Sequence, residues 1–216
     1  MIHEPASKNK TATANIPKEQ YWHEMRLRVA QMTDKLGKRV DAGIAETVVA
    51  LNALGILTTA SCEGHLDHGT GAPWVDIEDP NASEQSAEVG RLFQHALHVQ
   101  RQRAQITEEV MHLFEQAHQA KQHVKRIHLA MRYRLLVYLA AFYEHRQVPY
   151  DIRLVIQARD TTGRSRLESQ GADFQDVAPP DVKAQKLREY QEEIHAFTAF
   201  LKDRYFWEEG PESDDD

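Results

Sequence analysis

The sequence predicts an α+β fold in which a small mixed or antiparallel sheet is combined with long helices. Apolar residues recur every three or four positions over several long stretches, and short β-branched runs lie between these stretches. The chain has 216 residues, of which 41% are hydrophobic and 27% charged, so it can form one domain with its own core. We expect this domain to span residues 16–207.

Two helices are expected before the first strand. Residues 1–15 are polar and lack periodicity, so we expect them to be disordered. Pro17 suits the first turn of a helix, and Gly37 suits its end. Asp41 is expected to cap the second helix, which would end at Gly55. Both segments carry apolar residues at helical spacing: Tyr21, Met25, Leu27, Val29, Met32 and Leu36, then Ile44, Val48, Leu51 and Leu54.

Two short strands should flank a polar loop. Residues 56–61 are β-branched and rich in threonine, and residues 73–77 begin with a proline and then alternate. The loop between them is longer than a tight hairpin turn, so their direct pairing is left open.

A long helical insertion should follow, over about residues 83–146. Neither Gly nor Pro occurs between Arg91 and Val148, and apolar residues repeat every three or four positions. The pattern fits one very long helix or two helices that break near Gln119–Gln122. Because the apolar faces need cover, we expect helices folded back on one another, with enough apolar surface left to favour a homodimer.

The C-terminal third should supply the rest of the sheet and a covering helix. Residues 148–158 and 164–169 are predicted strands, and Asp181 is expected to cap a final helix. The net charge of -7 is concentrated at the end, because residues 208–216 carry six acids and no base. We expect this tail to be disordered and solubilising.

Composition limits the cellular setting. No apolar run reaches the roughly 20 residues that a membrane span needs, so no membrane partner is expected. The first residues lack the apolar core of a signal peptide, and one cysteine cannot form an internal disulfide. A cytoplasmic location is therefore expected.

The polar loop concentrates the side chains that do chemistry. Within seven residues it carries Cys62, Glu63, His65, Asp67 and His68. Thiolate, imidazole and carboxylate together suit Zn²⁺ or another divalent transition metal, and the Cys-x-x-His spacing lets both side chains reach one ion. We therefore expect Cys62, His65 and His68 as metal ligands. A closed structural site would need a further pair, for which His95 and His98 are candidates.

Three other interpretations of the loop stay open. Cys62 is a candidate nucleophile, activated by His65 or His68. Ser61, Glu63, Gly64 and His65 would also form a cradle whose backbone amides face a small anion. In a purely structural interpretation, Cys62 is an inert buried residue and Gly64 permits a tight turn. In the first two cases we expect Arg153, Arg166 and Ser169 to join the site from the later strands.

A local resemblance covers about residues 41–77. The run V-V-A-L-N-A-L-G-I-L-T-T-A-S-C-E-G-H, with Asp41 upstream and P-W-V-D-I downstream, resembles the T-T-S-S-C-S-G-R segment of the wybutosine-synthesis proteins. The resemblance implies tRNA modification with S-adenosylmethionine. The family's arginine is His65 here, which removes a fixed positive charge. The run also looks like small uncharacterised bacterial and phage proteins with an S-C-x-G-H loop.

The sequence therefore predicts a small-ligand- or metal-binding domain centred on the S-C-E-G-H loop, and it leaves open whether the domain is an enzyme. One alternative is a non-catalytic helical interaction or oligomerisation protein. Another, which the resemblance implies, is an RNA-modification-related protein. Nucleic-acid binding is suggested separately by a basic bias in the long helical region: Arg101, Arg103, Lys121, Lys125, Arg126, Arg132 and Arg134. Acidic residues interrupt this run, so we interpret it as a solvated helical face.

Overall fold

The computed structural model confirms the α+β class. It describes residues 16–33, 37–79, 81–103, 107–159 and 164–207. The expected disordered N-terminus, residues 1–15, and the acidic tail, residues 208–216, lie outside these ranges. The elements in chain order are α1 (Lys18–Gln31), α2 (Ala42–Ala53), β1 (Thr58–Cys62), β2 (Trp74–Ile77), α3 (Ala82–Arg103), α4 (Glu108–Tyr143), β3 (Leu154–Ala158), β4 (Ser165–Ser169), the 3-10 helix η1 (Ala172–Asp176) and α5 (Pro180–Trp207).

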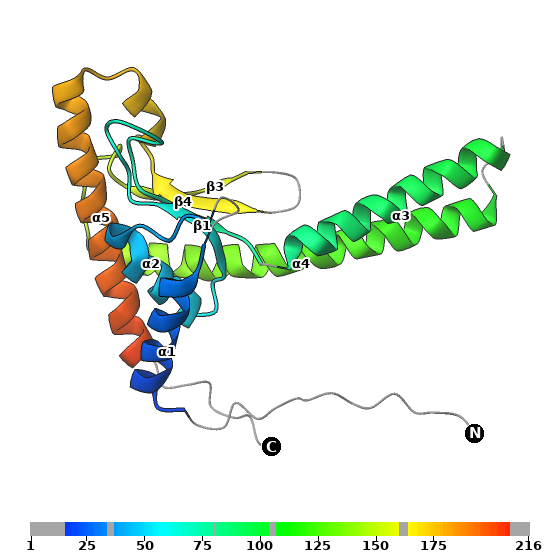
Figure 1. Cartoon of the computed structure of the whole chain (residues 1–216), viewed down its shortest axis with the longest axis horizontal. Coiled ribbons are helices and arrows are strands. Elements are labelled where there is room, and N and C mark those ends of the chain that lie inside the picture. The colour runs from blue at the N-terminus through cyan, green and yellow to red at the C-terminus, as the bar shows by residue number, and fades with distance from the viewer. Residues whose placement is uncertain (1–15, 34–36, 80, 104–106, 160–163, 208–216) are drawn as a thin grey trace.

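The four described strands form one antiparallel sheet in the order β1-β2-β4-β3 (Figure 1). β1 and β2 pair directly despite the long loop between them, with Cys62 opposite Trp74. The alternation of side chains puts Val75, Leu167 and Ile156 in one row across β2, β4 and β3. Val75 and Leu167 are fully buried there, whereas β1 is left as an edge strand beside the polar loop.

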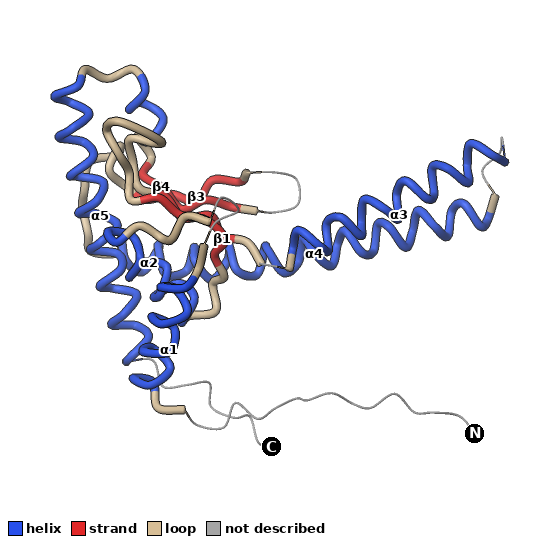
Figure 2. Tube along the Cα trace, viewed as in Figure 1, coloured by secondary structure: helices blue, strands red, loops and turns tan. Residues whose placement is uncertain are grey.

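One continuous core joins the sheet to four helices. Buried side chains of α1, α2, the C-terminal half of α4 and α5 pack with those of the strands, among them Trp22, Ile44, Leu51, Val75, Leu135, Leu167, Ile194 and Phe197. In Figure 2 these helices gather around the sheet, whereas α3 and the N-terminal half of α4 project away from it. The body of the domain therefore carries the site, and the α3–α4 hairpin extends from the body.

The position of the helical break is a correction. The region does fold back on itself as a hairpin, but α4 runs without interruption through Gln119–Gln122. The break lies between Arg103 and Thr107 instead. Thr107 caps α4 by accepting a hydrogen bond from the amide of Val110, and two acids stand in the first turn of the helix. Gln119 is exposed and Gln122 half-buried, so this polar run lies on a partly exposed stretch of a continuous helix.

Several predicted boundaries were wrong for local reasons. α1 ends at Gln31, before the predicted end at Gly37, and α5 begins at Pro180, so Asp181 lies inside its first turn. The strand predicted from residue 148 begins only at Leu154, because Pro149 starts a turn in which its carbonyl accepts from the amide of Ile152. Within the described residues, no helix has a stretch that is both long and apolar enough to cross a bilayer.

Candidate functional site

The polar loop begins where β1 ends at Cys62 and returns to the sheet at Trp74. Gly64 turns the chain with a positive φ of 84°. The amide of His65 then donates to the carbonyl of Thr70 over 2.8 Å, which closes the loop on itself. A Cβ at position 64 would lie 2.6 Å from Leu187 Cδ1 and 2.9 Å from the carbonyl carbon of Ala72, so only glycine fits this approach to α5.

Two carboxylates fasten this loop to the N-terminus of α2. Asp41 occupies the N-cap position, as predicted, but its side chain makes no capping bond. Its Oδ2 instead accepts from the amide of Glu63 over 3.2 Å. Glu63 Oε2 in turn accepts from the amide of Gly43 over 2.7 Å, so Glu63 satisfies the helix amide that Asp41 does not. The expectation that Asp41 caps α2 was therefore right about its position and wrong about its bonding.

Helix α5 holds the same region from the other side. Gln191 donates from Nε2 to the carbonyl of Glu63 over 3.0 Å. His195 Nε2 lies 2.7 Å from the carbonyl of Gly43. The start of α2 and helix α5, both distant from the loop in sequence, thus hold it, which gives its side chains a defined orientation.

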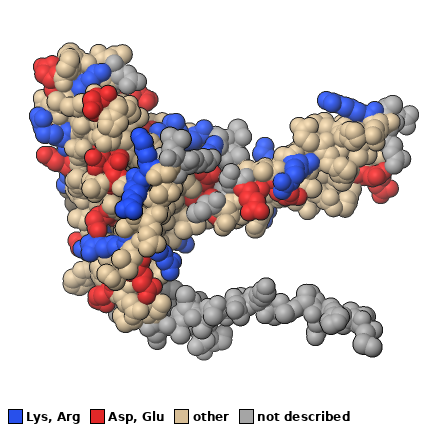
Figure 3. All heavy atoms as spheres, in the orientation of Figure 1, with Lys and Arg blue, Asp and Glu red and all other residues tan. Residues whose placement is uncertain are grey.

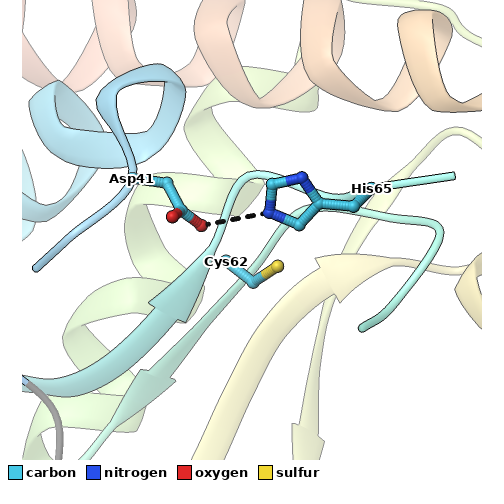
Figure 4. Close-up of side chains that lie close together, drawn as sticks. All are labelled: Asp41, Cys62 and His65. Atoms are coloured by element: carbon cyan, nitrogen blue, oxygen red, sulfur yellow. Dashed lines mark ion pairs between the residues drawn. The ribbon is translucent and has the colours of Figure 1, made fainter. Parts of the chain in front are cut away.

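Asp41, Cys62 and His65 converge on one point. One donor atom from each side chain lies within 4.8 Å of the others, and all three residues are half-buried. His65 Nε2 is 3.5 Å from Asp41 Oδ2. Figure 4 shows the thiol and the carboxylate on the side of the ring that carries this nitrogen, whereas the second ring nitrogen faces away. The amide of Gly64 also approaches Cys62 Sγ at 3.4 Å.

His68 belongs to a second, more exposed group with His65 and Asp67. Its ring stacks on that of His65 with centroids 4.2 Å apart, and its Nδ1 lies 2.7 Å from Asp67 Oδ1. This hydrogen bond lowers the pKa of the Asp67 carboxyl below its ordinary range. The side chains of His68 and Asp67 are 61% and 84% exposed, so this group faces solvent.

A cavity of about 250 Å³ opens beside the convergent side chains. One wall is β1, whose five residues Thr58–Cys62 all line it. The lining also includes residues on either side of the bridge between Thr33 and Arg39, together with Trp74. His65 and His68 also line the cavity, so the candidate donor atoms have a space in which a ligand could meet them.

The structure brings together only some of the residues predicted for the site. Ser61, Cys62, His65 and His68 line the cavity. Glu63 and Gly64 shape the loop but do not line the cavity, and the Glu63 carboxylate is turned toward α2.

The three residues predicted from the later strands lie elsewhere. Arg153 sits over the ring of Tyr143, with its guanidinium carbon 4.4 Å from the ring centroid. Arg166 makes a bidentate pair with Asp76, and its guanidinium carbon lies 3.7 Å from the centroid of the Trp74 ring. Trp74 lines the cavity but Arg166 does not, so Arg166 is connected to the cavity only by its contact with that ring. Ser169 is fully buried in β4, and its Oγ has no hydrogen-bond partner among the described residues.

Sequence reasoning missed Asp41, Lys38, Arg39 and Trp74 as members of this cavity. Asp41 could have been found, because it stands directly before the helix that feeds into β1 and the loop. Nothing in the spacing of Lys38 and Arg39 ties them to residues more than 20 positions later. Their place depends on tertiary packing that brings the residues around the Thr33–Arg39 bridge to the same cavity as β1.

One buried carboxyl lies near this cavity without lining it. Glu168 pairs with Trp74 in the sheet, so it shares the face that carries Cys62 and Trp74. Burial raises its pKa above the ordinary range of a carboxyl, despite the nearby guanidinium of Arg166. Its Oε1 has no partner in the described part of the chain, so the carboxyl sits in surroundings that disfavour its charge.

No model of a known protein family matches the chain, and neither a curated protein nor a solved structure matches it significantly.

Proposed function

We propose that the protein binds a divalent transition metal, with Zn²⁺ as the first candidate, through Asp41, Cys62 and His65. The observation that carries this proposal is the convergence of three different donor atoms on one point beside a cavity. Thiolate and carboxylate together balance the charge of a divalent cation, and imidazole completes a mixed set of ligands that Zn²⁺ accepts.

The distance between Asp41 and His65 supports a shared ion. Two ligand atoms about 2.1 Å from one zinc ion at a tetrahedral angle lie about 3.4 Å apart. The observed separation of His65 Nε2 and Asp41 Oδ2 is 3.5 Å. A charge-assisted hydrogen bond between the same groups would be shorter, at about 2.7–2.9 Å. The spacing therefore suits two ligands of one metal better than a direct bond.

The same geometry disfavours a Cys-His-Asp nucleophile. In such a triad the acid orients the imidazole through one ring nitrogen while the other nitrogen serves the nucleophile. Asp41 and Cys62 instead approach His65 from the same side of its ring (Figure 4). Cys62 as a nucleophile activated by His65 is the rival interpretation of this site, and metal analysis separates the two.

Three protein ligands would leave one position of a tetrahedral zinc open, and the adjoining cavity gives that position access to a small molecule. A metal held in this way can polarise a carbonyl or phosphoryl group, or lower the pKa of bound water. The chain's own residues fix the ligands: the amide of Glu63 orients the Asp41 carboxylate, and the turn at Gly64 aims His65. This arrangement favours an enzyme over a purely structural metal site.

The test is the metal content of the full chain purified without a histidine tag. We expect about one equivalent of Zn²⁺, Fe²⁺ or Mn²⁺ per chain after incubation and dialysis. Asp41→Asn, Cys62→Ser and His65→Ala should each weaken binding by more than the roughly 10- to 100-fold that loss of a ligand's hydrogen-bond partner costs. His98→Ala, a change to an exposed histidine of α3, is the control. A folded wild-type protein that stays metal-free would overturn the proposal.

A second candidate function rests on the surface of α4. Leu129, Tyr133, Leu136 and Ala140 are exposed and spaced four, three and four residues apart, as along the seam of two packed helices. Tyr133 is 70% exposed and Leu136 44% exposed. On the face shown in Figure 3, basic and acidic side chains are interspersed over the body. These features support self-association over nucleic-acid binding. Sedimentation of wild type and Tyr133→Glu tests this idea, and a monomeric wild type at high concentration contradicts it.

A further inference from the structure

Two groups of candidate metal ligands share one side chain. The inner group is Asp41, Cys62 and His65, and the outer group is His65, Asp67 and His68. Within each group, one donor atom from every side chain lies within 4.8 Å of the others. His65 is half-buried, whereas the side chains of His68 and Asp67 are 61% and 84% exposed. An ion that arrives from solvent at the outer group therefore already meets one ligand of the inner group.

We infer that the outer group is an entry site, which captures a divalent transition metal from solvent and passes it through His65 to the inner group. This inference rests on the proposed metal site. In the transfer, the bonds from the ion to the exposed side chains break while bonds to Asp41 and Cys62 form. The Cys62 thiol releases its proton to solvent as it becomes a thiolate ligand. The ion keeps its oxidation state throughout.

The contact between His68 and Asp67 prepares the imidazole to bind an ion. His68 Nδ1 lies 2.7 Å from Asp67 Oδ1. An ionised carboxylate only accepts hydrogen bonds, so the shared proton belongs to Nδ1 and the lone pair of the neutral ring lies on Nε2. A carboxylate at the far ring nitrogen is the usual partner of a metal-binding imidazole, because it fixes the tautomer and raises the basicity of the ring. Asp67 therefore makes His68 a better ligand.

The place of His68 connects solvent with the inner group. His68 is largely exposed, yet it lines the same cavity as His65 and Cys62. Its ring stacks on the ring of His65 with centroids 4.2 Å apart. The hydrogen bond from the amide of His65 to the carbonyl of Thr70 closes the segment that carries both rings. The exposed donors are therefore held directly beside the side chain that the two groups share.

The chemistry of the two groups gives the transfer a direction. The outer group offers two imidazoles and one carboxylate at the surface. The inner group offers one imidazole, one carboxylate and the thiolate of Cys62, and all three residues are half-buried. Thiolate is a strong ligand of Zn²⁺, and a site with fewer exposed donors loses its ion to water less readily. The outer group thus suits rapid capture, and the inner group suits retention.

Rapid mixing of the metal-free full chain, purified without a histidine tag, with Zn²⁺ tests the entry role. His68→Ala and Asp67→Asn should slow loading by about tenfold or more, the lower end of what a charged entry adds to an association rate. Zinc content and affinity at equilibrium should match those of wild type. Because affinity is the ratio of the two rates, a chelator should remove zinc more slowly by the same factor.

The control is a second exposed pair of neighbouring acid and histidine residues. His145 Nε2 lies 3.9 Å from Glu144 Oε1 at the end of α4, and both side chains are exposed. His145→Ala should load zinc at the wild-type rate. A loss of rate in this variant as large as that in His68→Ala would overturn the entry role, because it would trace the effect to surface histidines in general.

Loading with Co²⁺ shows the order of the two steps. An ion in the outer group has no thiolate ligand, so it gives visible bands without a thiolate-to-cobalt charge-transfer band. In wild type the visible bands should appear first and the charge-transfer band later. Cys62→Ser should keep the early phase, and His68→Ala should lose it. A charge-transfer band that rises in wild type together with the first visible absorption would contradict capture by the outer group.

The outcomes separate this inference from the proposed metal site. Full zinc uptake at the wild-type rate in both His68→Ala and Asp67→Asn would overturn the entry role and leave the metal site standing. A loss of zinc content in His68→Ala would make His68 a permanent ligand, which also overturns the entry role. A wild type that takes up neither zinc nor cobalt would overturn the metal site itself, and the entry role with it.

Discussion

The carboxylates of Asp41 and Glu63 form a pair of crossed hydrogen bonds between the start of α2 and the polar loop. Asp41 Oδ2 accepts from the amide of Glu63 over 3.2 Å, and Glu63 Oε2 accepts from the amide of Gly43 over 2.7 Å. Glu63, a residue of the loop, therefore caps the start of α2, and Asp41, at the start of α2, holds the loop amide of Glu63. Because Glu63 caps the helix in place of Asp41, the Asp41 carboxylate can face His65. The same pair of bonds therefore contributes to the stability of α2 and to the geometry of the candidate site.

The first prediction concerns the cap that Glu63 provides. Glu63→Ala removes the acceptor for the Gly43 amide and should lower the free energy of unfolding by about 0.5–2 kcal/mol, the usual cost of losing a helix cap. Glu46→Ala on the exposed side of the same helix is the control and should cost about 0–1 kcal/mol, since its pair with Arg26 is exposed. Urea unfolding measures both. Equal effects of the two changes would contradict the capping role.

A second prediction separates backbone strain from close packing at two glycines. Gly64 and Gly37 both have positive φ, but a Cβ at Gly37 would meet nothing within 4 Å. Gly37→Ala should therefore cost only about 1 kcal/mol of left-handed strain. Gly64→Ala adds overlap with backbone atoms of Ala72, so it should cost clearly more and also weaken metal binding. Similar stabilities of the two variants would show that the loop can move away from α5.

The third prediction concerns a buried carboxylate that ties α5 to the end of α4. The Glu193 side chain is 2% exposed, pairs with Arg146 at 2.6 Å and accepts from the Tyr143 hydroxyl. Arg146→Ala would leave this charge buried without its partner and should cost about 3 kcal/mol. Arg26→Ala, which breaks an exposed pair, should cost about 0–1 kcal/mol. Thermal and urea unfolding compare the two, and a small loss for Arg146→Ala would contradict the account of this network.

Most of the fold could be predicted because periodicity depends on local chemistry. The alternation around Val75 and Ile156 marked strands, and the glycine at position 55 marked the end of α2. The polar run Gln119–Gln122 suggests a break that α4 does not have, whereas Thr107 followed by two acids is the local signal that marks the start of α4.

The site could be predicted only where its residues are close in sequence. Cys62 and His65 are three positions apart and do converge. Asp41 joins them because it stands at the start of α2, which contacts β1, and Arg39 lines the same cavity as β1 from the residues just before α2. Arg153 and Ser169 were expected at the site on the basis of strand membership alone. The order β1-β2-β4-β3 instead places their strands on the far side of β2 from the loop's own edge strand.

The fourth prediction is a pH dependence of stability that arises from Glu168. Burial raises the pKa of this carboxyl in the folded protein, so the folded state binds its proton more tightly than the unfolded state does. Its contribution is therefore most favourable at low pH and is lost as pH rises through the folded pKa. Glu168→Gln should stabilise the protein at about pH 8 more than at about pH 4. A larger gain at low pH, measured by urea unfolding at both values, would contradict this sign.

The fifth prediction is that metal binding weakens as pH falls. Protons compete with the metal for imidazole and thiolate, so metal uptake should release protons and decline toward acid. The decline should persist in His68→Ala if His68 is not a ligand. Calorimetric titration of zinc in two buffers of different ionisation enthalpy measures the number of protons released. Uptake that does not change with pH would argue against thiolate and imidazole as ligands.

The absorption spectrum of the full chain loaded with Co²⁺ tests the central claim most directly. Cobalt held by Asp41, Cys62 and His65 should give a thiolate-to-cobalt charge-transfer band together with the intense visible bands of a tetrahedral ion. Cys62→Ser should lose the charge-transfer band, Asp41→Asn should weaken binding, and His98→Ala should leave the spectrum unchanged. A charge-transfer band that survives in Asp41→Asn with full affinity would remove Asp41 from the site, and a wild-type spectrum identical to that of free Co²⁺ would contradict the metal centre itself.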